Sequence, residues 1–496
     1  MAAEHETFPA PVYAETVLAP LFEQSTMHFA GAMAEIDRAH LVMLAETGVL
    51  AREQAAAIMA ARLAIEAAAD PTALVYDGTV EDYFFHVERA LTARLGVDLA
   101  GRLHTGRSRN DLGHAMFRMV LKDRLEGLMR DLHRATAALL DKAMRERRTI
   151  VMAYTHGQPA QPTTFGHYLA AFVEVLLRHG ARLDLAHEHL DRSPMGAAAI
   201  TTTGFALDRG RIARLLGFGG VQENSYGCIA ATDDVAAVYA GIKLLCVDLG
   251  RFAQDLAQWT AFETGYIVAP RGYVQISSIM PQKRNPVVVE HIRLLAGIAA
   301  GHADTIVDAV RNTPFMDIND SESETQVAGY PAFERAGRAL RLLGDFMTTV
   351  RIDEQRTREV IERSCATITE LADSLVRTEN LSFREAHEVA SAVARAVIAD
   401  GDTLGALELG RFVAIFQERV GRAPAIAAAD LRRFTSPEHF VEVRARFGGP
   451  AEASLIRSFG GYRERLDALE SRLAAAIGRR VEAREELDRL SRELAA

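Results

Sequence analysis

Apolar residues recur at helical spacing along most of the chain. The stretch from Asn110 to Arg148 contains no proline and only two interior glycines. Its leucines follow one another at three-, four- and seven-residue steps: Leu121, Leu125, Leu128, Leu132 and Leu139. This spacing predicts one long amphipathic helix. Three further long helices are predicted after Pro162 toward His189, from Asp233 to Phe262, and from Pro286 to Val310.

Helices of this length bury their apolar faces only by packing into a bundle. Strand-like alternation with Asn-Gly or Asp-Gly turns is nearly absent, so the sequence predicts an all-α fold. Boundaries after the loop GRLHTGRSRND and after the long central helices divide it into an N-terminal helical domain (1–110), a central long-helix bundle domain (111–362) and a C-terminal helical domain (363–496). The tail from Tyr462 to Ala496 predicts an amphipathic helix, for which packing is favoured over a binding role.

The overall charge of the chain disfavours nucleic acid as a partner. Fifty-six basic and sixty-six acidic residues give a net charge of −10, which argues against a nucleic-acid-binding protein with a dominant basic face. No apolar run reaches the roughly 18 residues that a membrane span needs, so no membrane partner is expected. Cys228, Cys246 and Cys365 lie far apart and form neither a disulfide framework nor a metal-binding pair, which predicts a cytoplasmic protein.

Polar, glycine-containing loops between long helices are where chemistry is expected. The loop Gly101–Asp111 holds Arg107, Ser108 and Asn110 directly before a predicted helix, an arrangement that recognises carboxylate or phosphate. A solvated capping loop is an equally good interpretation of this segment alone. In a second loop, His156 lies in a polar turn shaped by one glycine and two prolines, and is an acid–base candidate.

A third loop, SSIMPQKRNP, begins at Ser277 and leads toward Glu290. Two serines with a nearby lysine would fit a hydrolase nucleophile, but no GxSxG motif supports that interpretation. The loop instead closely resembles the signature GSSxMPxKxN of the aspartase/fumarase superfamily. The segments LHTGRSRND, YTHGQPAQP, GAAAITTTGFALDR, EDYFFHVERAL and DLAQWTAFETGY resemble the argininosuccinate lyase family in particular, in the family's order, over about residues 35–330.

This resemblance implies a three-domain aspartase/fumarase-type fold and a homotetramer whose active sites are each assembled from loops of three chains. It implies a reversible anti-elimination that releases fumarate from an N-substituted aspartate, without a metal or an organic cofactor. Catalytic roles carried over from the family fall on Ser277 as carbon-proton base, on His156 as the group that protonates the departing nitrogen, and on Glu290, which would orient His156. Substrate-binding roles fall on Arg107, Ser108, Asn110, Thr155, Gln158, Ser278, Lys283 and Asn285.

The departures from the family pattern lean toward the leaving-group side. Ile276 replaces the signature's leading glycine, Ile36-Asp37 replaces a Gly-Ser pair, and Tyr83-Phe84 follows Glu81-Asp82 where the family has isoleucine and histidine. The tyrosine, glutamine and lysine that hold the amino-acid end of the leaving group give way to a stretch with four carboxylates. These are Asp317, Asp320, Glu322 and Glu324.

The four carboxylates would repel an α-carboxylate and attract ammonium groups, so Asp320 is added to the substrate-binding candidates. An exposed acidic helix start is the competing interpretation. The sequence therefore favours a carbon–nitrogen lyase that converts argininosuccinate to arginine and fumarate. A diamine-derived substrate such as ethylenediamine-disuccinate is the alternative, and an adenylosuccinate-type substrate fits the flanking segments less well. A non-catalytic, crystallin-like structural protein is disfavoured by retention of Ser277, His156, Lys283 and Asn285.

Overall fold

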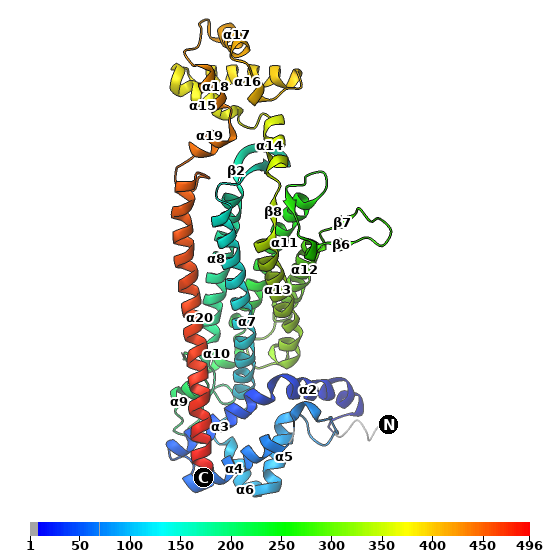
Figure 1. The fold of residues 1–496 in the computed structure, drawn as a ribbon. Helices are drawn as coiled ribbons and strands as arrows, with labels where there is room; N and C mark the ends of the chain where they lie inside the picture. Colours follow the sequence, from blue (N-terminus) through cyan, green and yellow to red (C-terminus); the bar gives the residue numbers. More distant parts are fainter. Residues whose placement is uncertain (1–7, 69) are drawn as a thin grey trace.

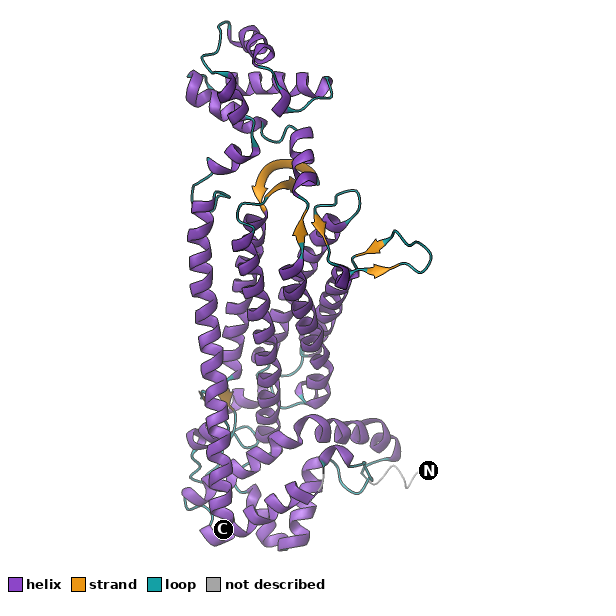
Figure 2. Ribbon diagram, viewed as in Figure 1, coloured by secondary structure: helices purple, strands orange, loops and turns teal. Residues whose placement is uncertain are grey.

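The computed structural model describes residues 8–68 and 70–496, and long helices dominate it (Figure 2). Five of the described helices run side by side as a central bundle (Figure 1). They are α7 (Arg109–Arg145), α8 (Phe165–Leu190), α11 (Asp233–Thr260), α12 (Val287–Ala309) and α13 (Ser323–Thr349). The four long helices predicted from apolar spacing are all present, and the predicted all-α bundle fold is confirmed.

The longest helix of the central bundle, α7, owes its start to polar residues and its burial to leucines. Ser108 and Asp111 form a reciprocal capping box at its first turn, which satisfies backbone N–H groups that the helix leaves free. Leu121, Leu125 and Leu132 are fully buried against the neighbouring helices. Each such leucine contributes about 2 kcal/mol of apolar burial.

Buried polar contacts fix how the long helices lie along one another. Lys142 on α7 donates to the backbone oxygen of Val350 at 2.7 Å, just beyond the end of α13. Glu126, also on α7, is buried between His187 at 3.0 Å and Arg480 at 2.7 Å. Sliding one helix along another would leave these charged groups buried without partners, which is costly.

Glycines allow the closest helix contacts. At the start of α8, a Cβ on Gly166 would lie 2.5 Å from the backbone oxygen of Ala143 and 2.6 Å from the Cα of Arg147. On α13, a Cβ on Gly329 would lie 2.1 Å from the hydroxyl of Tyr239 on α11. No other residue fits these two positions without moving a neighbour.

The tail forms α20 (Glu452–Ala495), a 44-residue helix that runs along the outside of the bundle (Figure 1). It packs against α7 and α8 and reaches the N-terminal helices. Arg472 pairs with Asp184 at 2.7 Å and Arg479 with Asp191 at 3.0 Å, both on or next to α8. The sequence grouped this tail with the C-terminal domain, whereas α20 packs mainly against the central bundle and the N-terminal helices. Apolar spacing shows that a helix forms but not the direction in which it runs through the fold.

The N-terminal unit carries its own apolar core, and the ends of α7 and α20 complete it. Its helices are α1 (Pro11–Tyr13), α2 (Ala19–Gln24), α3 (Ala30–Glu46), α4 (Arg52–Ala68), α5 (Tyr83–Leu95) and α6 (Val97–Gly101), with π-helical turns at Ala14–Leu18 and Ser25–Phe29. Two short helices, α9 (Arg209–Leu215) and α10 (Ser225–Ala230), lie in the connection between α8 and α11.

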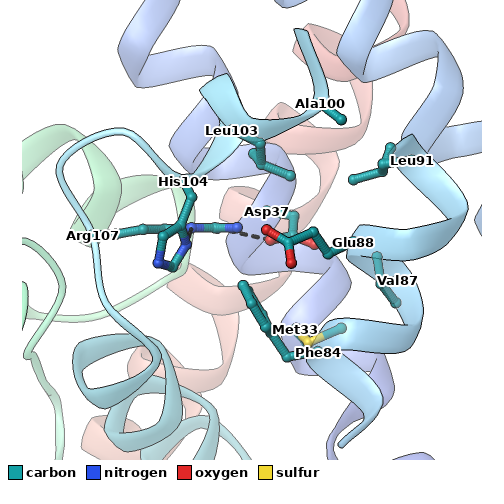
Figure 3. A pocket seen from close by; sticks show the side chains of 10 residues that line it. All are labelled: Met33, Asp37, Phe84, Val87, Glu88, Leu91, Ala100, Leu103, His104 and Arg107. Carbon is teal, nitrogen blue, oxygen red and sulfur yellow. Dashed lines mark hydrogen bonds and ion pairs between the residues drawn. The ribbon is translucent and has the colours of Figure 1, made fainter. Parts of the chain in front are cut away.

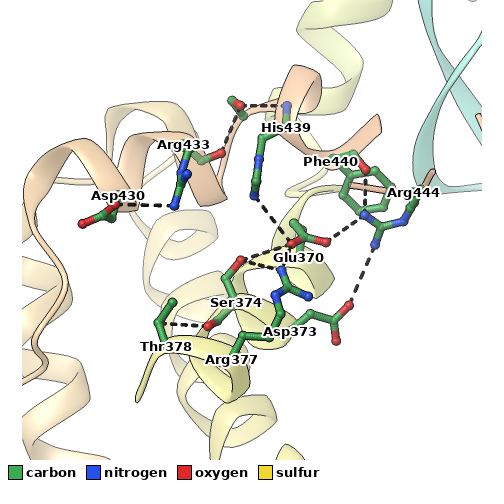
Figure 4. A network of polar contacts seen from close by, with 11 residues as sticks. Glu370, Asp373, Ser374, Arg377, Thr378, Asp430, Arg433, His439, Phe440 and Arg444 are labelled. Carbon is green, nitrogen blue, oxygen red and sulfur yellow. Dashed lines mark hydrogen bonds and ion pairs between the residues drawn. The ribbon is translucent and has the colours of Figure 1, made fainter. Parts of the chain in front are cut away.

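The C-terminal unit lies at the opposite end of the bundle (Figure 1). Its helices are α14 (Glu354–Arg363), α15 (Ile368–Glu379), α16 (Phe383–Ala399), α17 (Leu409–Val420), α18 (Ala428–Phe434) and α19 (Pro437–Glu442). The buried Glu370 organises one side of it (Figure 4): Ser374 donates to it at 3.1 Å, Arg444 lies at 2.8 Å, and Arg377 also pairs with it. These contacts join α15 to the segment that follows α19.

Short strand pairs lie at the turns of this helical fold. The antiparallel hairpin of β1 (Ile150–Thr155) and β2 (Gln158–Thr164) joins α7 to α8. The remaining pairs have two residues in each strand: β3 (Arg192–Ser193) with β4 (Gly220–Val221), β5 (Ile267–Val268) with β8 (Arg351–Ile352), and β6 (Gln275–Ile276) with β7 (Arg284–Asn285). Strands of two residues are too short to be predicted from alternating apolar and polar residues in the sequence.

Within the described residues, none of the helices combines the length and apolarity that crossing a membrane requires. Cys228, Cys246 and Cys365 are all buried and none is in a disulfide.

The packing at Gly166 generates a stability prediction. Gly166→Ala should lower the free energy of unfolding by about 1–3 kcal/mol, because the new methyl group would overlap backbone atoms that cannot rotate away. Gly127→Ala, in the middle of α7 with open space around the added Cβ, is the matched control and should be neutral or stabilising. Thermal unfolding of both variants checks this. Equal effects of the two substitutions would contradict it.

Candidate functional site

The loop before α7 is held rigidly by the start of that helix. Asp111, fully buried, accepts hydrogen bonds from the backbone N–H groups of Ser108 at 2.9 Å, Gly196 at 2.9 Å and Ala198 at 3.0 Å. Burial raises the pKa of Asp111, and these three donors oppose the rise. Asp111 therefore fixes Ser108 and the first turn of α7 against the 196–198 turn.

A buried ionic network anchors the same loop to the N-terminal unit. Arg107 pairs with Asp37 on α3 at 2.7 Å, and Arg62 on α4 donates to the other oxygen of Asp37 at 2.8 Å. Burial opposes ionisation of Asp37, but the charges of Arg107 and Arg62 outweigh it and lower its pKa. Figure 3 shows Arg107 reaching Asp37 beside His104. Arg107, a substrate-binding candidate from the sequence, is 7 % exposed and directed at Asp37.

His40, on α3, holds the loop at a second point. Its Nε2 lies 2.9 Å from the backbone oxygen of Thr105, which can only accept, so Nε2 carries the proton and donates. Burial, together with the charge of Arg107, lowers the pKa of His40 to about 3. The folded protein therefore keeps His40 neutral.

Asn110 opens onto a pocket between the N-terminal unit and the start of α13, with a volume of about 340 Å³. Its Nδ2 donates to Asp317 at 2.8 Å and to the backbone oxygen of Ala199 at 3.2 Å. Asp317 and Glu322, two of the four carboxylates singled out in the sequence, line this pocket. The other two, Asp320 and Glu324, are exposed and are not among its lining residues in the described chain.

The charge of this pocket is mainly negative. Arg109 is its one lining arginine within the described residues, and it already pairs with Glu81 at 3.1 Å and Asp82 at 2.9 Å. Burial, and next the charge of Asp317, raise the pKa of Glu322 above its ordinary value. The pocket therefore holds more carboxylate than its own cation neutralises.

At the far end of α7, the β1–β2 hairpin presents Thr155, His156 and Gln158 to solvent. His156 and Gly157 occupy its two-residue turn at φ values of 54° and 73°, the positive pair that a type I′ turn requires. A glycine accepts this conformation easily, but a histidine rarely does, so the strain at His156 marks the turn as a functional candidate.

The third candidate loop projects from the bundle as the β6–β7 hairpin (Figure 1). The side-chain oxygen of Ser277 accepts hydrogen bonds from the backbone N–H groups of Ile279 at 3.3 Å and Met280 at 3.0 Å. Donors of this kind favour an ionised oxygen. Among the described contacts, Ser278 receives no such donors. Lys283 directly precedes the returning strand, Asn285 lies on that strand, and Glu290 lies in the first turn of α12.

The structure does not bring these three loops together within one chain. Asn110 and Thr155 lie at opposite ends of α7, whose 37 residues span about 55 Å. The Ser277 loop precedes α12 and Asp317 follows it, so α12 separates them by about 35 Å. Ser108, Asn110, Asp317 and Glu322 form a group at one end of the bundle, whereas the His156 turn and the Ser277 hairpin lie toward the other.

Two features of the site escaped the sequence reasoning. His114 lies one turn after Asn110 on the same face of α7 and lines the same pocket, a signal that the spacing of four residues already carried. The pairing of Asp37 with Arg62 and Arg107 carried a weaker signal, the departure from the family pattern at Ile36-Asp37, because the partners of Asp37 lie on other elements.

Two family models match the chain. The family described as Lyase matches residues 23–301, and the family described as Argininosuccinate lyase C-terminal matches residues 365–442. Argininosuccinate lyase 2 of Agrobacterium fabrum is 53 % identical over 464 residues, covering 94 % of this chain and 92 % of the relative. EDDS lyase, solved as a variant with bound fumarate, is 29 % identical with a TM-score of 0.84, covering 95 % of this chain and 92 % of the other. A fumarate lyase from Mesorhizobium sp. BNC1 shares the fold at 22 % identity, with a TM-score of 0.69 and coverage of 87 % and 95 %.

The neutral state of His40 generates a pH prediction. Between its unfolded pKa of 6.5 and its folded pKa of about 3, only the unfolded chain binds a proton at this residue. Stability should therefore fall as the pH drops below 6.5, by about 1.4 kcal/mol per pH unit from His40 alone. His40→Gln keeps an amide donor at this position. Urea unfolding between pH 6 and 4.5 should show that the variant's free energy of unfolding changes less steeply with pH, by that amount per pH unit.

The matched control is His387→Gln, at an exposed position on α16. This variant should keep the parent slope. An unchanged slope in His40→Gln would show that His40 is not held neutral in the folded protein.

Proposed function

This chain belongs to the argininosuccinate lyase family and is a carbon–nitrogen lyase of that type, and on that premise we propose that it releases fumarate from an N-substituted aspartate by reversible anti-elimination. The observation that carries the proposal is the Ser277 hydroxyl, which two backbone N–H groups polarise in a projecting loop. A serine hydroxyl acts as a base only where its ionised form is stabilised.

The proposed reaction involves two proton transfers and two electron pairs, those of the C–H bond and of the C–N bond that break. Ser277 takes the proton from the carbon next to one carboxylate, and the electrons of that bond form the carbon–carbon double bond of fumarate. The bond from the neighbouring carbon to nitrogen breaks with its electrons going to nitrogen, which receives a proton from His156, oriented by Glu290. Lys283 and Asn285 supply fixed donors for the negative charge that develops on the carboxylate.

The remaining candidates hold the succinyl half of the substrate in this proposal. Ser108, Asn110, Thr155, Gln158 and Ser278 offer hydroxyl and amide groups to its carboxylates. Arg107 has a different part, because its pairing with Asp37 directs it into the N-terminal unit. We assign it to holding the Ser108–Asn110 segment in place.

We propose a homotetramer in which each site combines loops of three chains. The lengths of α7 and α12 support this, since they keep Asn110, His156 and Ser277 of one chain from forming one site. Another support is the outer face of α12, where Leu294 is 55 % exposed and Ile298 is 40 % exposed, with Gly297 and Gly301 beside them. Small and apolar residues in one stripe suit close packing against a second copy of the helix.

The names of the relatives support two substrates. Argininosuccinate follows from the 53 % identical relative, and a diamine-derived aspartate such as ethylenediamine-disuccinate follows from the similar solved structure. Both release fumarate, so the proposed chemistry is common to them. The buried, unpaired cysteines agree with the cytoplasm as the compartment.

Ser277→Ala should abolish most of the activity without affecting the fold. We expect kcat to fall about a thousandfold, because the base is lost, whereas the thermal midpoint should stay unchanged, because the loop projects from the bundle. Fumarate absorbance in the ultraviolet measures the rate. Ser278→Ala is the control and should have a much smaller effect on kcat; a larger effect there would move the base to Ser278.

Sites shared between chains should be restored by mixing two inactive variants. Ser277→Ala and Asn110→Ala, unfolded together at equal amounts and refolded, should regain about a quarter of the parent activity, because one site in four draws both residues from the unaltered copies. Each variant refolded alone is the control. No recovery in the mixture would mean that each site lies within one chain.

A further inference from the structure

The pocket beside Asn110 continues past the amide that is proposed to bind the succinyl half. Asp317 contacts that amide directly at 2.8 Å, so whatever adjoins the bound succinyl group meets this carboxylate first. Glu322 lines the same pocket five residues later, at the start of α13. The leaving group of the substrate therefore has an acidic wall.

This pocket also contains buried polar atoms that lack a partner. His114 is 9 % exposed, lines the pocket, and its Nε2 makes no hydrogen bond to any described residue. That nitrogen lies 3.8 Å from Asp317 Oδ1, which is also buried without a hydrogen bond in the described chain. Buried polar atoms are almost always paired in folded proteins, so two atoms without a hydrogen bond, on side chains that line one pocket, indicate a ligand that supplies donors and acceptors.

The balance of charge decides what kind of ligand this is. Glu81, Asp82, Asp317 and Glu322 line the pocket, against one guanidinium, Arg109, which two of these carboxylates already engage. A carboxylate on the leaving group would meet like charge and find no free cation among these residues. An ammonium or guanidinium group would find Asp317 and Glu322 available.

We infer that Asp317, Glu322 and His114 select the leaving group, and that it is an amine with at least one further cationic group and no carboxylate. This inference rests on the proposed function and deepens it. It sets aside both substrates that the relatives' names suggest, because arginine and the amine released from ethylenediamine-disuccinate both carry carboxylates. Asp317 and Glu322 accept hydrogen bonds from the cationic end, and the Nε2 of His114 completes the set of contacts. The elimination itself is unchanged, because the nitrogen still leaves with the electron pair of its bond to carbon and takes up one proton.

Agmatine and arginine make a matched pair of probes, since they differ by the α-carboxylate alone. In isothermal titration of the intact enzyme saturated with fumarate, agmatine should bind about tenfold or more tightly than arginine, because arginine would bring a carboxylate against the acidic wall. Addition of each amine to fumarate, followed as loss of ultraviolet absorbance and as adduct mass, should show the same order.

The charge-neutral variants Asp317→Asn and Glu322→Gln should each weaken agmatine binding by about tenfold and bring arginine closer to it. Glu322→Gln leaves the hydrogen bond between Asp317 and Asn110 in place, so it should also keep fumarate binding at the parent level. Glu324→Gln is the matched control, because it removes the same charge from the same segment at an exposed position outside the pocket. It should leave the preference unchanged. His114→Leu should weaken agmatine binding without improving arginine.

Arginine binding as tightly as agmatine, or an unchanged preference in both Asp317→Asn and Glu322→Gln, would overturn the inference, even with fumarate chemistry intact. The expected binding preference without adduct from either amine would support the pocket's selectivity and count against the proposed function instead. Binding and turnover thus report separately on the two proposals.

Discussion

The length of α7 is the constraint on which the rest of this structure depends. Its 37 residues bury one apolar stripe against α8 and α13 and separate the groups at its two ends by about 55 Å. No rearrangement of side chains closes such a distance. A chain built on helices of this length can use the residues at both ends in one site only by combining copies of itself, so the helix length that stabilises the bundle is also the reason for the proposed sharing of the site.

The bundle keeps its ends in place through buried polar contacts as much as through leucines. Glu126 on α7 pairs with His187 on α8 and Arg480 on α20, which fixes the positions of these three helices along one another. Lys142 performs the same task near the end of α13. Apolar packing alone tolerates small slides along a rod, whereas a buried charge tolerates none without losing its partner. The loops at the helix ends are therefore held in fixed positions relative to one another.

Two of the positions at which this chain departs from its family pattern form defined sets of contacts in the structure. Asp37, in place of a small residue, holds Arg107 together with Arg62 and so anchors the loop that carries Asn110. Asp317 and Glu322 lie in the stretch that departs from the family pattern, and they line the pocket beside the same Asn110. The first set maintains the position of Ser108 and Asn110, which are proposed to bind the succinyl half of the substrate. The second makes the pocket acidic, which is the basis of the proposed selection of a cationic amine.

The sequence by itself determined the long helices, because apolar spacing and the absence of proline depend only on local order along the chain. It also determined the three candidate loops, since each is a compact motif such as the one beginning at Ser277. Tertiary structure decided the rest. Only two of the four carboxylates line the pocket, His114 joins them there, and α20 returns along the bundle. All three features depend on contacts between residues distant in sequence. Such contacts arise from packing directions and helix lengths that no local pattern encodes.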